Sequence, residues 1–358
     1  MKYNFNSGPS ILPQTVYEQA SQAILDYNNT GLSILEIGHR TPIFEGILDE
    51  ASQLARELMG LSNDYEILFL HGGATTQFLQ IPYNFLGASE TAAYLDCGTW
   101  GTKAIKEAKA FGTVHLLGTS KDKNYSYIPK GYTIPDGIKY IHITSNNTIE
   151  GTQQNSWPEK NGAYLVADMS SDILSRQMDF NNFDLIYAGA QKNIGAAGVT
   201  FVAVKKDIIS ATVPDRHIPS MLDYRKHIDN GSMLNTPPVF AVYVCLLTLR
   251  WLKALGGLQA IEPVNNQKAK LLYDTLDTLP VFTPTVALED RSVMNVVWIM
   301  ENKTLEDAFL ATCKEAGMVG IKGHRSVGGF RASLYNALPL SSVQALTDLM
   351  TDFAKKNG

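Results

Sequence analysis

The sequence has 358 residues, of which 45% are hydrophobic and 18% are charged, and its formal net charge is −5. This length accommodates one large and one smaller domain, and the composition is typical of a soluble globular protein. Because the balance is acidic and no basic run occurs, we expect no binding to nucleic acid or to an anionic membrane surface.

The cysteines and the N-terminus indicate where such a chain resides. Cys97, Cys245 and Cys313 are too widely spaced for a disulfide framework or a metal site. The opening "MKYNFNSGPSILP" has no apolar signal core, and no stretch approaches the roughly 18 apolar residues that a membrane span needs. The sequence therefore predicts a cytoplasmic protein without a bound metal or a transmembrane segment.

Short apolar runs alternate with amphipathic segments along the first two-thirds of the chain. We expect buried strands within residues 65–73, 91–98, 113–118, 139–145, 163–171, 183–191 and 199–206. Helices are expected between them, for example at 76–87 and 100–112. Apolar strands that alternate with helices indicate an α/β architecture with a mainly parallel mixed sheet.

A long helical stretch follows, and beyond it the pattern changes. Helices are expected at 237–257 and 258–279, strands at 292–300 and around 318–323 and 329–336, and helices at 304–317 and after Pro339. This last part resembles a compact α+β unit. We therefore predict a large domain at 15–257 and a smaller C-terminal α+β domain, 258–358, that also includes residues 1–14.

Lys192 stands in an unusual setting, the stretch "AGAQKNIGAAG", directly after an expected buried strand. Most lysines in such a place extend from a loop to water. The alternative is a lysine whose pKa is lowered by burial, which prepares an amine to form a Schiff base.

Other polar groups follow neighbouring strands, and the carboxyl ends of parallel strands meet at one edge of a sheet. The glycine turn at 72–73, followed by Ala74 and Thr75, suits a phosphate, although a plain strand-to-helix turn explains it equally well. Asp168 is either a turn-forming residue or the partner of a protonated heteroaromatic nitrogen. Trp100 is either a core aromatic or a cover for a flat ring.

Together these groups suit one cofactor. Pyridoxal 5′-phosphate requires an amine for its aldehyde, an acid for its ring nitrogen, a phosphate cup and an aromatic cover. Lys192, Asp168, the 73–76 turn and Trp100 supply these four functions. The sequence thus predicts a pyridoxal-phosphate site in which the lysine also moves a proton.

Eight stretches in order resemble the phosphoserine aminotransferases, a family of fold-type-I pyridoxal-phosphate transferases. They are "NFNSGPSILP", "EIGHRT", "GTW", "NNTIEGT", "VADMSS", "GAQKNIG", "LNTPP" and "KGHRSVGGFRASLYNALP". The resemblance implies a homodimer with shared active sites. It also implies transamination between 3-phospho-L-serine and 2-oxoglutarate, giving 3-phosphooxypyruvate and L-glutamate in L-serine biosynthesis.

The resemblance assigns a role to individual residues. Lys192 corresponds to the Schiff-base lysine, and the expected cofactor ligands are Ala74, Thr75, Trp100, Thr148, Asp168 and Gln191, with Asn235 and Thr236 contributed by the partner subunit. The expected substrate ligands are Ser7, Arg40 and Arg331 for carboxylates, and His39, His324 and Arg325 for a phosphate. Where one branch of the family has glycine and arginine, this chain has Ala74 and Thr75, so backbone N–H groups and a hydroxyl are the expected phosphate donors.

Three other functions are compatible with parts of the pattern. A cysteine desulfurase needs a nucleophilic cysteine on a mobile loop, and no cysteine here has that setting. A serine–glyoxylate-type aminotransferase needs no second anion pocket, whereas this chain has "GHR" at both 38–40 and 323–325. A catalytically silent binding protein does not need Lys192. Whether 4-phosphohydroxy-L-threonine, a substrate of pyridoxine biosynthesis, is also used stays open.

Overall fold

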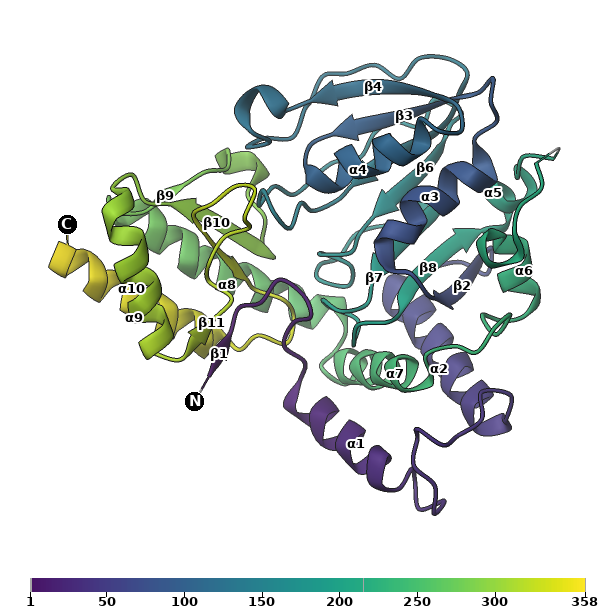
Figure 1. Cartoon of the computed structure of the whole chain (residues 1–358), viewed down its shortest axis with the longest axis horizontal. Coiled ribbons are helices and arrows are strands. Elements are labelled where there is room, and N and C mark those ends of the chain that lie inside the picture. Colours follow the sequence, from purple (N-terminus) through teal and green to yellow (C-terminus); the bar gives the residue numbers. More distant parts are fainter. Residues whose placement is uncertain (1, 215, 358) are drawn as a thin grey trace.

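The computed structural model describes residues 2–214 and 216–357, and a seven-stranded sheet forms its centre (Figure 1). The strands are β2 (Tyr65–Leu70), β3 (Thr91–Asp96), β4 (Thr113–Thr119), β5 (Ile138–Thr144), β6 (Tyr164–Asp168), β7 (Leu185–Gly189) and β8 (Thr200–Lys205). Their order is β2-β8-β7-β6-β5-β3-β4. Strand β8 is antiparallel to both β2 and β7, whereas the other neighbouring pairs are parallel. The prediction of an α/β fold with a mainly parallel mixed sheet is therefore confirmed.

The reversed direction of β8 has a simple cause. Only residues 190–199 connect β7 to β8, and a parallel crossover needs a dozen or more residues. The chain therefore turns back beside β7, and the turn contains Lys192. Lys192 lies at the carboxyl edge of the parallel strands because it follows the last residue of β7 by three positions.

Both faces of this sheet are covered. Ile67 and Phe69 of β2 pack in one core with α2 (Pro42–Met59) and α7 (Val239–Ala254), while Leu68 and Leu70 pack in another with α3 (Gly73–Phe85) and α4 (Thr99–Ala108). Alternate residues of a strand point to opposite faces, so a strand that is buried on both sides is apolar throughout. This explains the continuous apolar runs in the sequence.

A second, smaller sheet lies toward the C-terminus (Figure 1). It contains β9 (Thr283–Pro284), β10 (Asn295–Ile299) and β12 (Phe330–Ser333) in the order β12-β10-β9, and it packs with α8 (Leu258–Thr278), α9 (Glu306–Glu315) and α10 (Leu340–Asn357). At the other end of the chain, β1 (Tyr3–Asn4) pairs in parallel with β11 (Met318–Val319). Phe5 belongs to the same core as Trp298 and Phe309. The domain boundaries at 14/15 and 257/258 stay a prediction.

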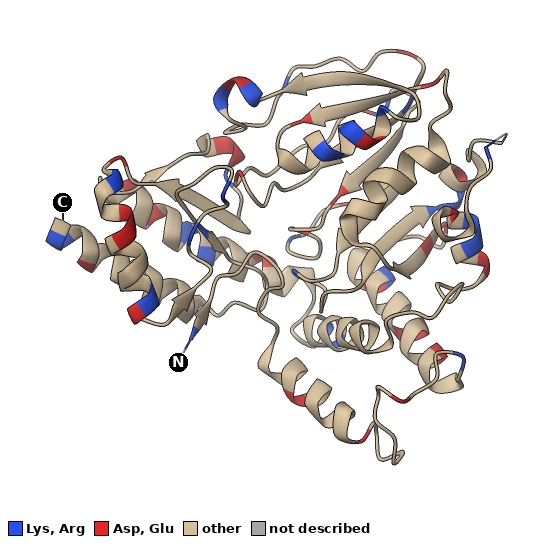
Figure 2. Cartoon of the chain, viewed as in Figure 1, with Lys and Arg blue, Asp and Glu red and all other residues tan. Residues whose placement is uncertain are grey.

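The remaining helices are α1 (Gln14–Leu25), α5 (Lys206–Ser210) and α6 (Tyr224–Asp229). Across 2–214 and 216–357, no single helix is long and apolar enough to cross a bilayer; α7 and α8 meet that criterion only as a pair bent by 90°. Figure 2 shows acidic and basic residues interspersed along exposed helices such as α4 and α10.

At Gly195 the β7–β8 turn packs directly against the backbone of α7. A Cβ atom at this position would lie 2.8 Å from Cys245 Sγ and 3.0 Å from the backbone N and Cα of Cys245. Backbone atoms inside a helix cannot move aside as a flexible side chain can, so the turn must shift if a methyl group is added.

Gly195→Ala is expected to lower the free energy of unfolding by about 1–3 kcal/mol through overpacking. Thermal unfolding of both proteins measures this change. The control is Gly46→Ala in α2, where a Cβ atom meets nothing within 4 Å and the better helix propensity of alanine is worth up to about 1 kcal/mol. Equal melting temperatures for the Gly195→Ala variant and the wild type would contradict this account of the turn.

Candidate active site

A cavity of about 260 Å³ lies at the carboxyl edge of the parallel strands. Its walls come from the N-terminal segment, the ends of β5 and β6, the beginnings of α3 and α4, the Lys192 turn and two residues of the smaller unit. The lining residues are Ser7, Gly8, Gly73, Ala74, Thr75, Trp100, Thr144, Asn146, Thr148, Ile149, Asp168, Ser170, Ser171, Gln191, Lys192, His324 and Arg331. The structure thus brings together ten of the predicted site residues.

Lys192 is a buried amine, with 8% of its surface exposed. Its Nζ donates to Thr148 Oγ1 at 2.7 Å. Burial lowers the pKa of Lys192 to about 8, while Asp168 acts in the opposite direction and Arg331 lowers the pKa further. Of the two interpretations of this lysine, the structure supports the buried amine with a lowered pKa over the solvated loop residue.

Asp168 ends β6 and is likewise buried. Its Oδ1 accepts a hydrogen bond from the backbone N–H of Ser170 at 2.9 Å. Burial raises the pKa of Asp168, and the hydrogen bonds from Ser170 together with the charge of Lys192 oppose this rise. A carboxylate held in this way can stabilise a positive charge in the cavity.

The N-terminus of α3 and the ring of Trp100 form two further walls. Gly72 and Gly73 take positive φ angles of 91° and 67°, and α3 begins at Gly73. The free N–H groups of such a helix start suit a phosphate. Trp100 is the second residue of α4, and its Nε1 is buried without a hydrogen-bond partner among the described residues.

Arg331, in β12, brings a buried guanidinium to the opposite wall. Its Nη1 donates to the carbonyl oxygen of Thr148 at 3.0 Å, and its Nη2 donates to Ser7 Oγ at 2.7 Å. Among residues 2–214 and 216–357 it forms no salt bridge with a carboxylate, and its Nε has no partner. A buried cation without an acidic partner is costly unless an anion binds it. The geometry therefore indicates an anion subsite beside Lys192.

His324 lines the same cavity as Arg331, whereas Arg325 is exposed and does not line it. The Nδ1 of His324 lies 2.7 Å from Ser326 Oγ. Burial lowers the pKa of His324, and the charges of Arg331, Arg325 and Lys103 lower it further. Three cations thus act on one imidazole at the mouth of the cavity.

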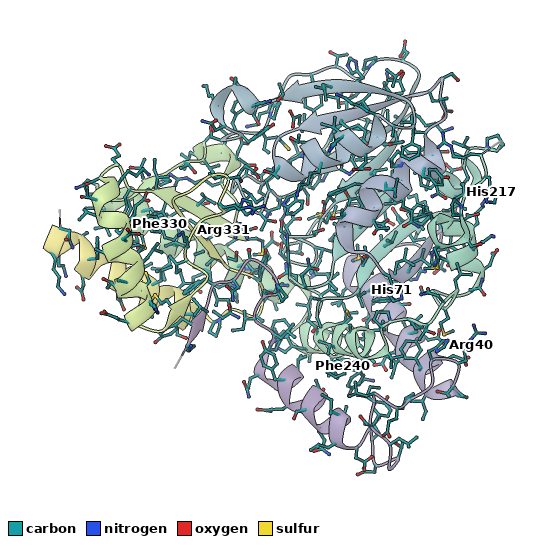
Figure 3. The ribbon with its side chains drawn as sticks, in the orientation of Figure 1. Arg40, His71, His217, Phe240, Phe330 and Arg331 are labelled. Atoms are coloured by element: carbon teal, nitrogen blue, oxygen red, sulfur yellow. The ribbon has the colours of Figure 1, made fainter. Side chains whose placement is uncertain are left out.

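Besides Arg325, four predicted residues lie outside the cavity of the single chain. Arg40 and His39 interact with each other, with 3.3 Å between Arg40 Nε and His39 Nε2, and Figure 3 places Arg40 far from Arg331. Asn235 and Thr236 do not line the cavity either. The Nε2 of His71 lies 3.0 Å from the carbonyl oxygen of Thr236.

The N-terminal segment supports the Lys192 turn, which our reasoning from the sequence did not predict. Ser10 Oγ donates to the carbonyl oxygen of Lys192 at 2.6 Å, and the Ser10 N–H donates to that of Gln191 at 2.9 Å. A Cβ atom on Gly8 would lie 3.3 Å from Lys192 Cγ. No periodicity or spacing signals these contacts, because they join residues 182 positions apart.

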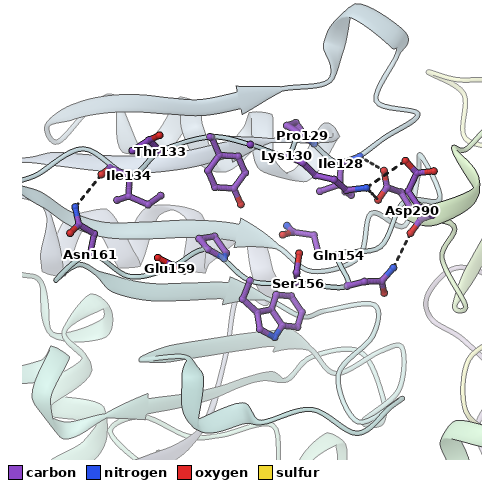
Figure 4. A pocket seen from close by; sticks show the side chains of 16 residues that line it. Ile128, Pro129, Lys130, Thr133, Ile134, Gln154, Ser156, Glu159, Asn161 and Asp290 are labelled. Carbon is purple, nitrogen blue, oxygen red and sulfur yellow. Dashed lines mark hydrogen bonds and ion pairs between the residues drawn. The ribbon is translucent and has the colours of Figure 1, made fainter.

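A second cavity, of about 860 Å³, lies between residues 128–134, residues 154–161 and Asp290 (Figure 4). Its buried acid is already neutralised, since Lys130 Nζ lies 2.9 Å from Asp290 Oδ1. Its lining residues include neither an unpaired buried cation nor the first turn of an α-helix. The chemistry therefore belongs to the smaller cavity around Lys192.

A doubly covered α/β sheet with a buried lysine in the turn after a central strand is the arrangement of the class-V aminotransferases. The model of the family "Aminotransferase class-V" matches residues 2–346. Two solved structures of low identity, a ureidoglycine–glyoxylate aminotransferase from Bacillus subtilis at 14% and an alanine–glyoxylate aminotransferase from Nostoc at 16%, share the fold with TM-scores of 0.79 and 0.77.

Much more similar proteins narrow the family. The chain is 56% identical over 356 residues to a phosphoserine aminotransferase of Flavobacterium johnsoniae, with 99% of both chains covered. A solved phosphoserine aminotransferase from Bacillus circulans is 43% identical, with a TM-score of 0.97 over 100% of this chain and 99% of the other. A pyridoxal-phosphate-bound one from Trichomonas vaginalis is 34% identical, with a TM-score of 0.93 over 98% and 100%. The chain belongs to the phosphoserine aminotransferase family, which confirms the resemblance.

The lowered pKa of Lys192 gives a direct prediction for the apoprotein. Labelling of Lys192 by a small acylating reagent is expected to rise with a midpoint near pH 8, because the unprotonated amine is the nucleophile. Mass spectrometry of the labelled peptide measures this midpoint, with the exposed Lys270 as the reference in the same digest. Asp168→Asn is expected to move the midpoint lower, since the carboxylate raises the pKa of Lys192. A midpoint near the ordinary lysine value of 10.5 would refute the buried-amine interpretation.

Proposed function

We propose that this protein transfers the amino group between 3-phospho-L-serine and 2-oxoglutarate, giving 3-phosphooxypyruvate and L-glutamate, with pyridoxal 5′-phosphate as its cofactor. The reaction serves L-serine biosynthesis in the cytoplasm. The observation that carries this proposal is the buried guanidinium of Arg331, which pairs with no carboxylate among the described residues and lies with His324 in the same cavity as a lysine prepared for a Schiff base. Membership of the phosphoserine aminotransferase family supports the choice of substrate.

The residues present fit the cofactor. Lys192 supplies the amine, Asp168 the acid for the ring nitrogen, and Trp100 the aromatic cover. Ala74 and Thr75, at the start of α3, together with Gln191 form the phosphate cup. When bound, pyridoxal phosphate supplies an aldehyde that takes up an amino group and a ring that withdraws electrons from the neighbouring carbon.

The chain's own residues then determine where protons go. An amine with a pKa of about 8 exchanges a proton near neutral pH, so Lys192 can serve as the general acid and base. Thr148 holds its Nζ on one side of the cavity. Asp168 keeps a negative charge opposite the ring nitrogen, and the buried setting strengthens that interaction.

The substrate's two negative ends have two positive partners. Arg331 can grip the α-carboxylate through the guanidinium that already touches Ser7. In this proposal the distal group binds beside His324, which lines the cavity, with the charges of Arg325 and Lys103 close to that imidazole. A distal pocket of this kind accepts the phosphate of phosphoserine or the second carboxylate of glutamate. 4-Phosphohydroxy-L-threonine presents the same two anions and is a second candidate donor, relevant to pyridoxine biosynthesis.

A second copy of the chain completes the site in this proposal. His39, Arg40, Asn235 and Thr236 do not line the cavity of their own chain. The segment before His39 exposes large apolar side chains, with Leu25 at 75% and Leu35 at 63%, and such a cluster suits a subunit interface. In a two-fold dimer each chain can present these polar residues to the other's cavity.

Other activities fit less well. A cysteine desulfurase needs an accessible thiolate, whereas Cys97 is buried and burial raises the pKa of its thiol to about 12. A serine–glyoxylate-type enzyme has no use for the distal positive pocket. A silent binding protein gains nothing from a buried amine with a lowered pKa.

Arg325→Leu is expected to reduce kcat/KM for phosphoserine by about 10- to 100-fold, because a guanidinium makes charge-assisted hydrogen bonds to a phosphate. Serine, which has no phosphate to lose, is expected to be turned over at an almost unchanged low rate. Measuring kcat/KM for both donors with 2-oxoglutarate, in wild type and variant, tests the substrate and the pocket together. Equal losses for both donors would remove Arg325 from the pocket, and serine as the better wild-type donor would overturn the proposed substrate.

Mixing two inactive variants tests the shared site. In a heterodimer of Lys192→Ala and Arg40→Leu chains, one cavity carries both defects and the other carries none if Arg40 acts across the interface. Random mixing should then restore about a quarter of the wild-type rate. If Arg40 serves its own chain's cavity, every cavity carries a defect and no activity returns. The control mixture, Lys192→Ala with Asp168→Asn, should stay inactive because both residues line one chain's cavity.

A further inference from the structure

A row of polar and aromatic side chains lies behind Asp168 on the face of the sheet that α3 and α4 cover. In the strand registers Asp168 of β6 is opposite Tyr187 of β7, and Tyr94 of β3 is opposite His142 of β5. Asp168 is also opposite Thr144, two residues after His142. Because side chains two residues apart share a face, all four point to the same side of the sheet.

These groups contact one another in sequence. His142 Nε2 lies 2.8 Å from the hydroxyl of Tyr187. The imidazole stacks on Tyr94, with 4.9 Å between ring centroids and an interplanar angle of 21°. Tyr187 lies directly opposite Asp168 in the strand register, and burial together with the charge of that carboxylate raises the pKa of the Tyr187 hydroxyl well above its usual value. Tyr187 and His142 are almost completely buried.

The direction of the hydrogen bonds follows from the tautomer of His142. Burial lowers the pKa of His142 to about 3, so the ring carries a single proton at neutral pH. Its Nδ1 is buried without a partner in the described part of the chain. If the proton were on Nδ1, an N–H donor would be unsatisfied and the Tyr187 hydroxyl would turn its lone pairs toward a carboxylate. A proton on Nε2 avoids both costs.

We propose that His142 and Tyr187 are positioning residues for Asp168: His142 donates from Nε2 to the Tyr187 hydroxyl, which donates in turn to the carboxylate. The chain of two hydrogen bonds holds the carboxylate ionised and oriented toward the ring nitrogen that it serves. This inference rests on the proposed role of Asp168 toward pyridoxal phosphate. The other groups that act on Asp168 are Lys192, Ser170 and Asp172.

The apoprotein tests the hydrogen-bond chain without any cofactor. With ¹⁵N-labelled histidine, the NMR shifts of His142 are expected to show a proton on Nε2 and none on Nδ1 from pH 6 to 9, and His142→Phe identifies the signals. A proton on Nδ1 would reverse the first hydrogen bond and overturn the proposal. This result does not depend on whether the proposed function is correct.

The holoenzyme tests the effect on Asp168. With pyridoxal phosphate labelled by ¹⁵N in its ring, the nitrogen is expected to stay protonated from pH 6 to 9 in the wild type and to lose its proton within that range in Tyr187→Phe. We expect kcat to fall about tenfold with little change in KM, since one hydrogen bond to a charged group is lost. The matched control is Tyr94→Phe. It removes a buried hydroxyl that contacts Tyr140, at 2.8 Å, instead of Asp168.

Two outcomes would overturn the positioning role. One is a ring nitrogen in Tyr187→Phe that titrates as in the wild type, and the other is an equal loss of kcat in Tyr94→Phe. A second variant covers the case in which Tyr187→Phe folds poorly. His142→Phe keeps an aromatic ring against Tyr94 and leaves the Tyr187 hydroxyl in place, so it is expected to shift the titration of the ring nitrogen and kcat in the same direction as Tyr187→Phe. An unchanged titration in His142→Phe would likewise overturn the proposal. Failure of the wild type to bind pyridoxal phosphate would instead refute the proposed function.

Discussion

The burial of Lys192 is the constraint on which the rest of the structure depends. Removing an ammonium group from water is costly, and the cavity lowers this cost by letting the amine lose its proton near neutral pH. The charge of Asp168 raises the pKa of Lys192, and the charge of Arg331 lowers it. The short β7–β8 turn, the close contact of Gly195 with α7 and the brace from Ser10 all hold the lysine in this position.

The smaller unit contributes charge to a site that the larger sheet organises. The sheet edge provides the acid, the amine and the helix start, which are groups that suit a planar cofactor. Arg331 and His324 belong to β12 and the turn before it, and the buried guanidinium of Arg331 adds a positive charge that suits an anion. In the proposed function, reaction chemistry and substrate selection are therefore supplied by different parts of the chain.

The sequence predicts which residues lie at the carboxyl edge of the sheet, because the apolar character of a strand and the residue at which it ends are local properties. The runs at 65–70, 164–168 and 185–189 lie where their apolar character indicates, so Asp168 and Lys192 could be paired in advance. The antiparallel direction of β8 was missed because it depends on the length of a connection. The distance of Arg40 from the cavity is also a tertiary fact that no pattern in one sequence encodes. His142 was not predicted, because both its place on the Asp168 face and its contact with Tyr187 depend on the register between strands.

The pairing of β1 with β11 has a consequence for synthesis. Residues 3–4 are synthesised 315 residues before their partners at 318–319, and Arg331 reaches Ser7 across 324 positions. Contacts between such distant segments close a very long loop and form late. A nascent chain can therefore build the large sheet with its lysine in place, yet it has no complete anion subsite until β12 and its Arg331 have been made. Partly translated protein is catalytically silent for a reason built into the chain topology.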